Sequence, residues 1–209
     1  MCPDQIMDLL IQTFFLFAGI VLALWYENLG SSKLIFYPGE TLDLTLEDGK
    51  RARSLRIKIK NVPRKLPFVP RQTASSCHGT IVFLDTQKKA ISNPMQIRWV
   101  DSPEPIKKEI LNNQIINLPE PNLIRLSRYI VIPPDESELC DLAIRFFNEN
   151  TAYGWCTDSY FKNMRHSDYT LNRGSYFAKV SILTGDSKFE AIIPFSNPPD
   201  YKNFNLGQF

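Results

Sequence analysis

A long apolar segment near the N-terminus constrains this chain more than any other feature. Residues 9–26 read LLIQTFFLFAGIVLALWY and carry no charged side chain. A helix rises about 1.5 Å per residue, so the run covers roughly 27 Å of a hydrocarbon core about 30 Å thick. Trp25 and Tyr26 stand at its end, where aromatic residues anchor helices at the membrane interface. The run predicts a single-pass transmembrane helix, with the lipid bilayer as a partner through residues 9–26.

A cleaved signal peptide and a buried core helix are the competing interpretations. A signal peptide has Lys or Arg before its apolar stretch and small residues at its cleavage site, whereas this flank contains only Asp4 and Asp8 as charged residues. The run is apolar on all sides and lacks the polar stripe of a surface helix. Its Leu, Ile, Phe and Val residues favour insertion by about 3 to 7 kcal/mol, before Gln12 and Gly19 reduce the gain.

The flanking charges indicate an orientation. The first basic residue after the run is Lys33, and further ones follow from Lys50 onward, while the N-terminal flank has none. Basic residues favour the cytoplasmic side. The chain also has no Asn-x-Ser/Thr acceptor, and its four cysteines lack the spacing of a disulfide framework. We therefore expect the N-terminus outside and the large domain in the cytoplasm.

Composition limits the rest of the chain. The 209 residues carry a net charge of +2, which implies no field for nucleic acid as a partner. Fifteen prolines against nine glycines suit short strands and extended connections. The expected organisation is a flank, the transmembrane helix, a connector, one β-sandwich domain and a polar tail, at residues 1–8, 9–26, 27–33, 34–197 and 198–209.

Strand patterns fill the expected domain. In residues 55–60, Leu55, Ile57 and Ile59 alternate with basic residues, a period of two that buries one face of a strand. Turn signals separate further strands, and Thr184-Gly185-Asp186 is the best hairpin signal. The other predicted strands are residues 34–37, which end at Pro38-Gly39, and 76–84, 95–100, 123–132, 139–147, 175–183 and 189–195.

Two segments are ambiguous. Residues 139–147 read LCDLAIRFF, which fits a strand with Cys140, Leu142, Ile144 and Phe146 inward, or a helix, because a short apolar run does not settle its own period. The neighbouring strands favour a strand there. Residues 105–112 fit one or two helical turns.

Seven or more strands with short turns predict an all-β fold, a β-sandwich. The segment from Arg173 to Val180, RGSYFAKV, resembles the Gly-x-Tyr strand start of immunoglobulin-like domains, in which a tyrosine corner ties the strand to a preceding turn. This resemblance implies a corner at Tyr176 and a core tryptophan at Trp99. The sequence departs from the family pattern at Ala178, where a true immunoglobulin domain has cysteine, and Cys77 lies too far before Trp99.

Catalytic and metal-binding residues are sparse. Cys77 and His78 are adjacent, so a strand would point them to opposite faces and prevent joint ligation of one ion. Cys156 and His166 would need the fold to bring them together as nucleophile and base, and neither lies in a known motif. There is no Cys-x-x-Cys and no glycine-rich phosphate loop. We expect no cofactor and no metal.

Carboxylates and thiols leave further alternatives open. A glycosidase needs two carboxylates at a set separation, and the chain offers three groups: Asp101 with Glu104, Asp135 with Glu136 and Glu138, and Asp158 with Asp168. A disulfide among Cys77, Cys140 and Cys156 would require an external location. Cys2, close to the bilayer, is a lipidation candidate, although a free thiol is the simpler assumption.

The most distinctive loop is residues 63–71, PRKLPFVPR. Its prolines favour extended backbone, either as a rigid connector or as a ligand of a proline-binding domain. Together with the basic side chains of residues 55–60 it predicts a basic, apolar-tipped interaction surface for anionic lipid or an acidic partner. The surface comprises Arg56, Lys58, Lys60, Arg64, Lys65, Phe68 and Arg71.

Three functional hypotheses follow. The first is a membrane-anchored, non-catalytic β-sandwich that binds a protein partner, because the chain combines an anchor with no clustered catalytic residues. The second is a membrane-anchored hydrolase that uses dispersed carboxylates or Cys156 with His166. The third is a structural subunit of a membrane complex, which predicts an exposed apolar patch.

Overall fold

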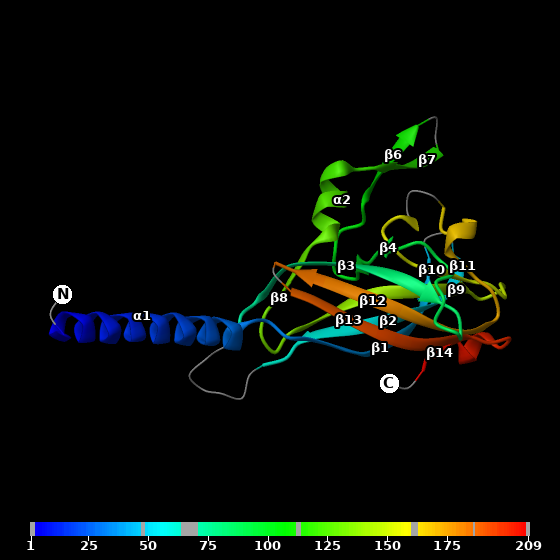
Figure 1. The fold of residues 1–209 in the computed structure, drawn as a ribbon. Helices are drawn as coiled ribbons and strands as arrows, with labels where there is room; N and C mark the ends of the chain where they lie inside the picture. Colours follow the sequence, from blue (N-terminus) through cyan, green and yellow to red (C-terminus); the bar gives the residue numbers. More distant parts are fainter. Residues whose placement is uncertain are drawn as a thin grey trace.

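A long N-terminal helix and a β-rich domain make up the computed structural model (Figure 1). The structure describes residues 3–46, 49–63, 71–111, 114–159, 163–185 and 187–207. Helix α1, Pro3–Gly30, projects from one end of the domain. Its described side chains from Ile11 to Tyr26 are mostly exposed. Among the described residues, no helix has both the length and the apolar character needed to cross a membrane.

Two six-stranded antiparallel sheets form the domain. The first sheet has the order β1, β2, β9, β10, β11, with β5 paired to β9. Its strands are β1 Leu34–Thr45, β2 Arg51–Asn61, β5 Arg98–Trp99, β9 Ser137–Phe146, β10 Ala152–Gly154 and β11 Thr170–Leu171.

The second sheet has the order β14, β13, β12, β3, β4, with β8 paired to β3. Its strands are β3 Ala74–Leu84, β4 Met95–Gln96, β8 Ile130–Ile132, β12 Gly174–Thr184, β13 Ser187–Asn197 and β14 Asn205–Leu206. Short 3-10 helices, η1 Ser167–Tyr169 and η2 Tyr201–Asn203, lie near the end of the domain away from α1 (Figure 1). The predominantly β character of the domain and its two antiparallel sheets confirm the prediction of an all-β, sandwich-like fold.

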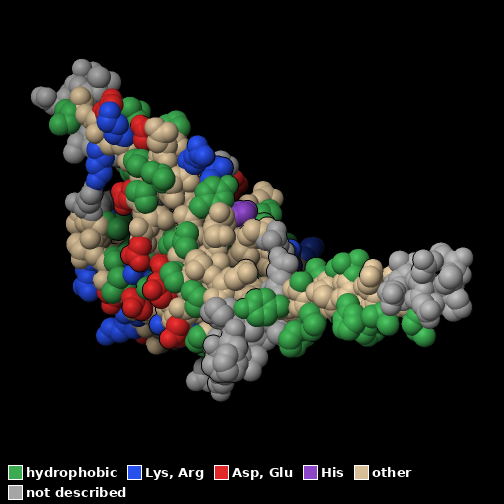
Figure 2. Space-filling model, turned by 90° about the vertical axis from the view of Figure 1, so that its left-hand side faces the viewer, with side chains coloured by type: hydrophobic (Ala, Val, Ile, Leu, Met, Phe, Trp, Pro, Cys, Tyr) green, Lys and Arg blue, Asp and Glu red, His purple; other side chains and the backbone are tan. Residues whose placement is uncertain are grey.

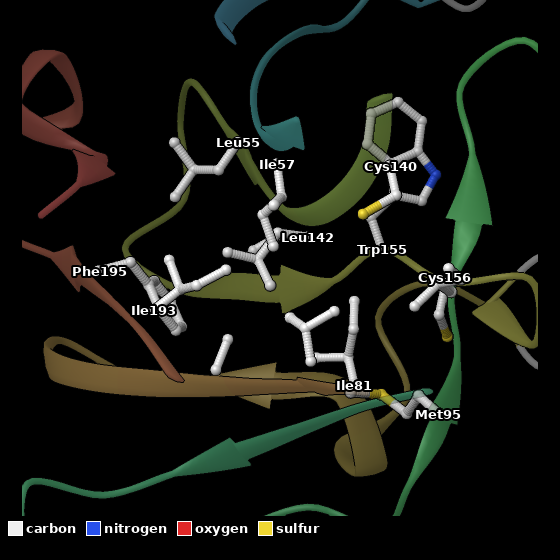
Figure 3. Close-up of a cluster of buried hydrophobic side chains, with 14 of the residues drawn as sticks. Leu55, Ile57, Ile81, Met95, Cys140, Leu142, Trp155, Cys156, Ile193 and Phe195 are labelled. Atoms are coloured by element: carbon white, nitrogen blue, oxygen red, sulfur yellow. The ribbon is translucent and has the colours of Figure 1, made fainter. Parts of the chain in front are cut away.

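The core lies between the two sheets (Figure 3). Leu55, Ile57 and Ile59 of β2 are fully buried, which confirms the period-two prediction. From the facing sheet, Val180 and Ile182 of β12 are equally buried. Burying such aliphatic side chains stabilises a fold by about 1.5–3 kcal/mol each.

Strand β9 crosses the middle of the first sheet, between β2 on one side and β10 and β5 on the other. The predicted inward residues Cys140, Leu142, Ile144 and Phe146 are all buried. The strand interpretation of this segment is therefore confirmed. Its other face is also covered, because Arg145 is buried as well.

The predicted strand at residues 123–132 is wrong over most of its length. Helix α2, Pro121–Arg128, occupies it, and only β8 is extended. The side chain of Glu120 accepts a hydrogen bond from the backbone N–H of Asn122, and Pro121 begins the helix. These are ordinary helix-start signals, which outweigh the β propensity of the apolar residues that follow.

The helical turns predicted at residues 105–112 are also wrong. Strand β6, Ile106–Leu111, pairs with β7, Gln114–Pro119, in a separate hairpin that projects with α2 from the sandwich (Figure 1). Ile110 on this hairpin is 77% exposed. The cross-strand pairing between residues 106–111 and 114–119 stabilises the extended conformation here.

Three boundaries also need correction. Pro38 and Gly39 do not end the first strand: β1 continues to Thr45, with a register shift between Pro38 and Thr41. The strand predicted at residues 95–100 is split into β4 and β5, which belong to different sheets. The residues 198–209, expected as a polar tail, contain η2 and β14, and Phe204 is fully buried. Burial of Phe204 explains why this segment joins the domain.

Two residues that the resemblance singled out, Tyr176 and Trp99, have well-defined surroundings in the structure. The hydroxyl of Tyr176 donates a hydrogen bond to the carbonyl of Asn172 at 2.9 Å, which is the contact expected of a tyrosine corner. Trp99 is fully buried in the core. Strands β12 and β13 pair as the predicted hairpin requires, with Thr184 opposite Ser187, while Asp186 of the predicted turn lies outside the described residues.

Candidate functional site

The basic residues of β2 do not form a free basic stripe. Arg56 donates from Nε to Oδ1 of the buried Asp141 at 3.1 Å. Lys60 pairs with Asp135, with 2.6 Å between Nζ and Oδ1. Lys58 is exposed. Of the three basic side chains in residues 55–60, two are thus already paired with carboxylates.

Of the other predicted surface residues, Arg71 has a structural role, and the rest lie outside the residues that the structure describes. Arg71 donates from Nε to the carbonyl of Val62 at 3.1 Å and from Nη1 to the carbonyl of Ser31 at 2.7 Å. Arg71 therefore ties the segment after α1 to the domain. Three members lie outside the described residues: Arg64, Lys65 and Phe68.

Cys156 and His166 are placed in different surroundings. Cys156 is buried, and its backbone carbonyl accepts a hydrogen bond from Ser159 Oγ at 2.6 Å. His166 is exposed, and its Nδ1 lies 3.4 Å from Oδ2 of Asp168. In the described part of the chain no hydrogen bond joins Cys156 to His166. Burial also raises the pKa of the Cys156 thiol to about 11, which disfavours the thiolate that nucleophilic catalysis needs.

The remaining sequence candidates lie in several places, and among the carboxylates Asp101 and Glu136 approach Glu138, whose pKa is raised by burial and by these two neighbouring charges. Cys77 is buried, and the ring of the half-buried His78 makes an edge contact with Tyr129 at 5.2 Å between centroids. Asp101 lines a shallow pocket together with Lys58. Across the ranges that the structure describes, no three His, Cys, Asp or Glu side chains are grouped as metal ligands would be.

Alkylation should distinguish buried thiols from reactive ones. Cys77, Cys140 and Cys156 are free and buried, and burial raises the pKa of Cys77 and of Cys156 from 9.0 to about 11. In a Cys2→Ser variant at pH 8, we expect iodoacetamide to modify Cys77 and Cys156 at least about a hundredfold more slowly in the native protein than in urea, because the thiolate fraction falls tenfold per pKa unit. Peptide mass spectrometry measures both rates. Rapid native labelling of Cys156 would restore it as a nucleophile candidate.

A pocket that the sequence analysis missed lies at the opposite end of the domain from α1. Strand β1 begins next to α1 at Leu34, and its other end, Thr45, pairs with Arg51. The pocket has a volume of about 440 Å³. We call it the distal pocket, lined by Gly49, Lys50, Arg51, Phe146, Phe147, Asn148, Glu149 and Arg165.

One wall of the distal pocket is held by a compact group of contacts. Arg165 donates to Oε1 of Glu149 from Nε at 2.9 Å and from Nη2 at 2.7 Å. Its guanidinium lies 3.9 Å from the ring centroid of Phe146. The Tyr153 hydroxyl donates to the other oxygen of Glu149 at 2.8 Å. The carboxylate of Glu149 is therefore neutralised by Arg165.

Another wall of the distal pocket presents a guanidinium stacked on an aromatic ring. Arg51 lies 5.4 Å from the ring centroid of Phe147, which is 51% exposed. Phe147 in turn makes an edge contact with Tyr201 at 5.3 Å. Arg51 forms no ion pair with any residue that the structure describes. A stacked guanidinium with open N–H groups suits a carboxylate or phosphate oxygen.

A second arginine, Arg53, contacts Tyr201, the residue that packs against Phe147. Arg53 donates from Nε and Nη2 to the two oxygens of Asp43, at 2.7 and 2.8 Å. It also lies 5.0 Å from the ring centroid of Tyr201. The hydrogen bond from Arg53 holds the pKa of Asp43 below its usual value. These contacts fix Tyr201, against which Phe147 packs.

The signal for the distal pocket was present in the sequence as two doublets. Lys50-Arg51 follows the turn glycine Gly49, and Phe146-Phe147 ends a strand. Each doublet is unremarkable alone, and only the pairing of β2 with β9, which places Ala52 opposite Phe146, brings them together. No family model, curated protein or solved structure matches this chain.

Proposed function

We propose that this protein is a single-pass, membrane-anchored binding module with a non-catalytic β-sandwich of the immunoglobulin-like kind. The bilayer is its first partner, through residues 9–26, and a protein is its second. The observation that carries the proposal is the apolar surface of α1. Ile11, Phe14, Phe17 and Leu24 of this helix are 47–68% exposed, although water disfavours such surface by about 25 cal/mol per Å².

The arrangement of the helix supports a bilayer as the environment of these side chains. Figure 2 shows hydrophobic side chains along the part of the helix that stands clear of the domain, whereas the domain surface mixes acidic and basic groups. The described apolar side chains run from Ile11 to Tyr26, about 24 Å of helix. In the sequence the run begins at Leu9, which extends it toward the thickness of a hydrocarbon core.

The end of α1 is coupled to the domain by backbone contacts. The N–H of Gln72 donates to the carbonyl of Gly30 at 2.7 Å, and Val62 N–H donates to the carbonyl of Lys33 at 2.9 Å. Asn61 adds a side-chain acceptor for the Lys33 N–H at 3.2 Å. A helix held in this way would orient the sandwich relative to the bilayer, with the distal pocket pointing away from it.

Flotation of membranes tests the anchor. In a Phe17→Asp, Val21→Asp variant, each carboxylate costs about 2.5–3.5 kcal/mol at the centre of the bilayer. We expect the wild-type chain to float with vesicles through a density gradient after an alkaline carbonate wash, and the double variant to stay at the bottom. A Phe17→Leu, Val21→Leu variant is the matched control and should float. Equal flotation of the two double variants would contradict the anchor.

The same vesicles report the side of the membrane. On the charge pattern we propose the cytoplasmic side for the domain. In sealed vesicles of known orientation, protease should therefore digest the domain in inside-out vesicles and spare it in right-side-out ones. The reverse pattern would place the domain outside and overturn the orientation.

The hydrolase alternative gains no comparable support. Its nucleophile candidate Cys156 is buried with a raised pKa, and its base candidate His166 lies on the exposed 3-10 turn with Asp168. We therefore propose binding rather than catalysis as the task of the domain.

A further inference from the structure

We infer that the distal pocket binds an acidic peptide segment of a partner protein, with a carboxylate on Arg51 and an apolar side chain against Phe147. This inference rests on the proposed function in one respect, namely that the partner is a protein that the anchored domain meets at the membrane. The charge and the contacts of the pocket do not depend on the anchor, whereas the exclusion of bilayer headgroups as the ligand does.

The first step is the charge of the pocket. The described lining includes the guanidinium groups of Arg51 and Arg165 and the carboxylate of Glu149. Because Glu149 already accepts two hydrogen bonds from Arg165 and one from Tyr153, it does not compensate Arg51. The lining is complementary to a ligand of negative charge.

The second step is preorganisation. Phe147 is held by the edge contact with Tyr201, and Tyr201 is held by Arg53. Arg51 therefore stacks on a ring that Tyr201 already holds in place. Less side-chain entropy is lost when the N–H groups of Arg51 bind an oxygen. The exposed face of Phe147 beside it provides apolar contact for a neighbouring side chain.

The third step is the class of ligand. The pocket lies at the far end of β1, a strand of 12 residues that spans roughly 35–40 Å at about 3.3 Å per residue. This distance exceeds the Debye length of about 8 Å several times over, so headgroups of the anchoring bilayer are out of reach. The net charge of +2 provides no field for nucleic acid. A peptide carboxylate with an adjacent apolar group fits the remaining chemistry.

Selection from a random peptide library tests the proposal. The full chain in detergent micelles, with no need for insertion into a bilayer, serves as bait, and Arg51→Ala and Arg125→Ala are tested in parallel. Arg125 lies exposed on α2, so its removal changes the charge equally at another place. We expect peptides rich in Asp or Glu beside an aromatic residue to be enriched by wild type and by Arg125→Ala, and not by Arg51→Ala.

Affinities of a selected peptide then give the magnitude. Fluorescence anisotropy should show binding weakened about tenfold to a hundredfold by Arg51→Ala, the range expected for a charge-assisted hydrogen-bonded pair, and unchanged within twofold by Arg125→Ala. Replacing the acidic residues of the peptide with Asn or Gln should have the same effect as Arg51→Ala. Phe147→Ala should also weaken binding, as an independent variant of the same wall.

Several results would overturn the inference. These are the absence of any acidic enrichment with wild type, equal binding by Arg51→Ala, and equal binding of the amide peptide. Binding to separate phosphatidylserine vesicles that depends on Arg51, with no peptide binding, would assign the pocket to lipid instead. The micelle assay does not require insertion into a bilayer. Failed flotation with intact peptide binding would therefore reject only the anchor. Normal flotation without peptide binding would reject only the pocket.

Discussion

Replacing Asp141 with asparagine is expected to lower the free energy of unfolding by about 3–5 kcal/mol, the usual cost of breaking a buried ion pair at one partner. Asp141 is fully buried on β9. It accepts hydrogen bonds from Arg56 Nε, from Arg98 Nη1 and from the Ser54 hydroxyl. Without the carboxylate, the guanidinium groups of Arg56 and Arg98 lose the buried counter-charge that they share, and the exposed Glu40, 3.9 Å from Arg56 Nη1, is a weak replacement.

Urea denaturation of the wild type and the variant measures this difference. Asp101→Asn, on an exposed turn, is the control and should change the free energy of unfolding by less than about 0.5 kcal/mol. The double variant Asp141→Asn, Arg56→Met should recover part of the loss, because it removes one of the unpaired cations. A loss below about 1 kcal/mol for Asp141→Asn would show that the network is not a unit of stability.

Replacing Arg145 with methionine is expected to cost a similar amount, about 3–5 kcal/mol, for a different reason. Arg145 is 1% exposed and binds acceptors from two segments, the turn after β9 and the end of β13. It donates to the carbonyl of Glu149 at 3.0 Å, to Asn197 Oδ1 at 2.9 Å and to the carbonyl of Pro199 at 2.9 Å. Methionine fills much of the space but leaves these acceptors without their donor.

This substitution should also release the C-terminal segment locally. Hydrogen exchange is expected to accelerate at Phe204 and Gly207, whose backbone N–H groups bond to Tyr201 and Pro194, before the central strands are affected. Arg173→Met is the control, because Arg173 is exposed at the same end of the domain and contacts Asn150. Uniform acceleration of exchange throughout the domain would argue against a local clamp.

Arg145 works together with Asn197, which is also fully buried. The amide nitrogen of Asn197 donates to the carbonyls of Asn150, Leu171 and Asn172, at 3.0 to 3.1 Å. Its oxygen accepts from Arg145. At the end near α1, Asn61 is used in a related way and donates to the carbonyls of Gln72 and Ile132 at 3.0 Å. Buried amides thus satisfy irregular backbone at both ends of the sandwich.

Regular strands could be predicted from the sequence where a single local pattern decided the outcome. The alternation of residues 55–60 is such a case, since one face of β2 packs on the core. The Thr184 turn is another, because a tight hairpin needs only its own residues. Prediction failed at residues 123–132 and 105–112, where apolar content suits both helix and strand and the pairing partner or helix cap decides.

For the candidate site too, the sequence showed the residues but not their contacts. The basic residues of β2 were visible in the sequence, but their carboxylate partners were not: Arg56 meets Asp141 across a strand pair, and Lys60 meets Asp135 across a loop. The arginine and phenylalanine of the distal pocket stand 96 positions apart, at Arg51 and Phe147. Ion pairs and aromatic stacking act over a few ångströms, so only the register between β2 and β9 could reveal them.

By itself the sequence determined that this protein has a long apolar segment near its N-terminus and a β-rich domain, because hydrophobic runs and period-two alternation are properties of neighbouring residues. The tertiary structure alone decided which charges are neutralised and which remain available. Arg56 and Arg145 became internal supports, whereas Arg51 was left stacked on Phe147 at the surface. Charge and burial at a position depend on residues far away in the chain, which the fold brings within contact distance.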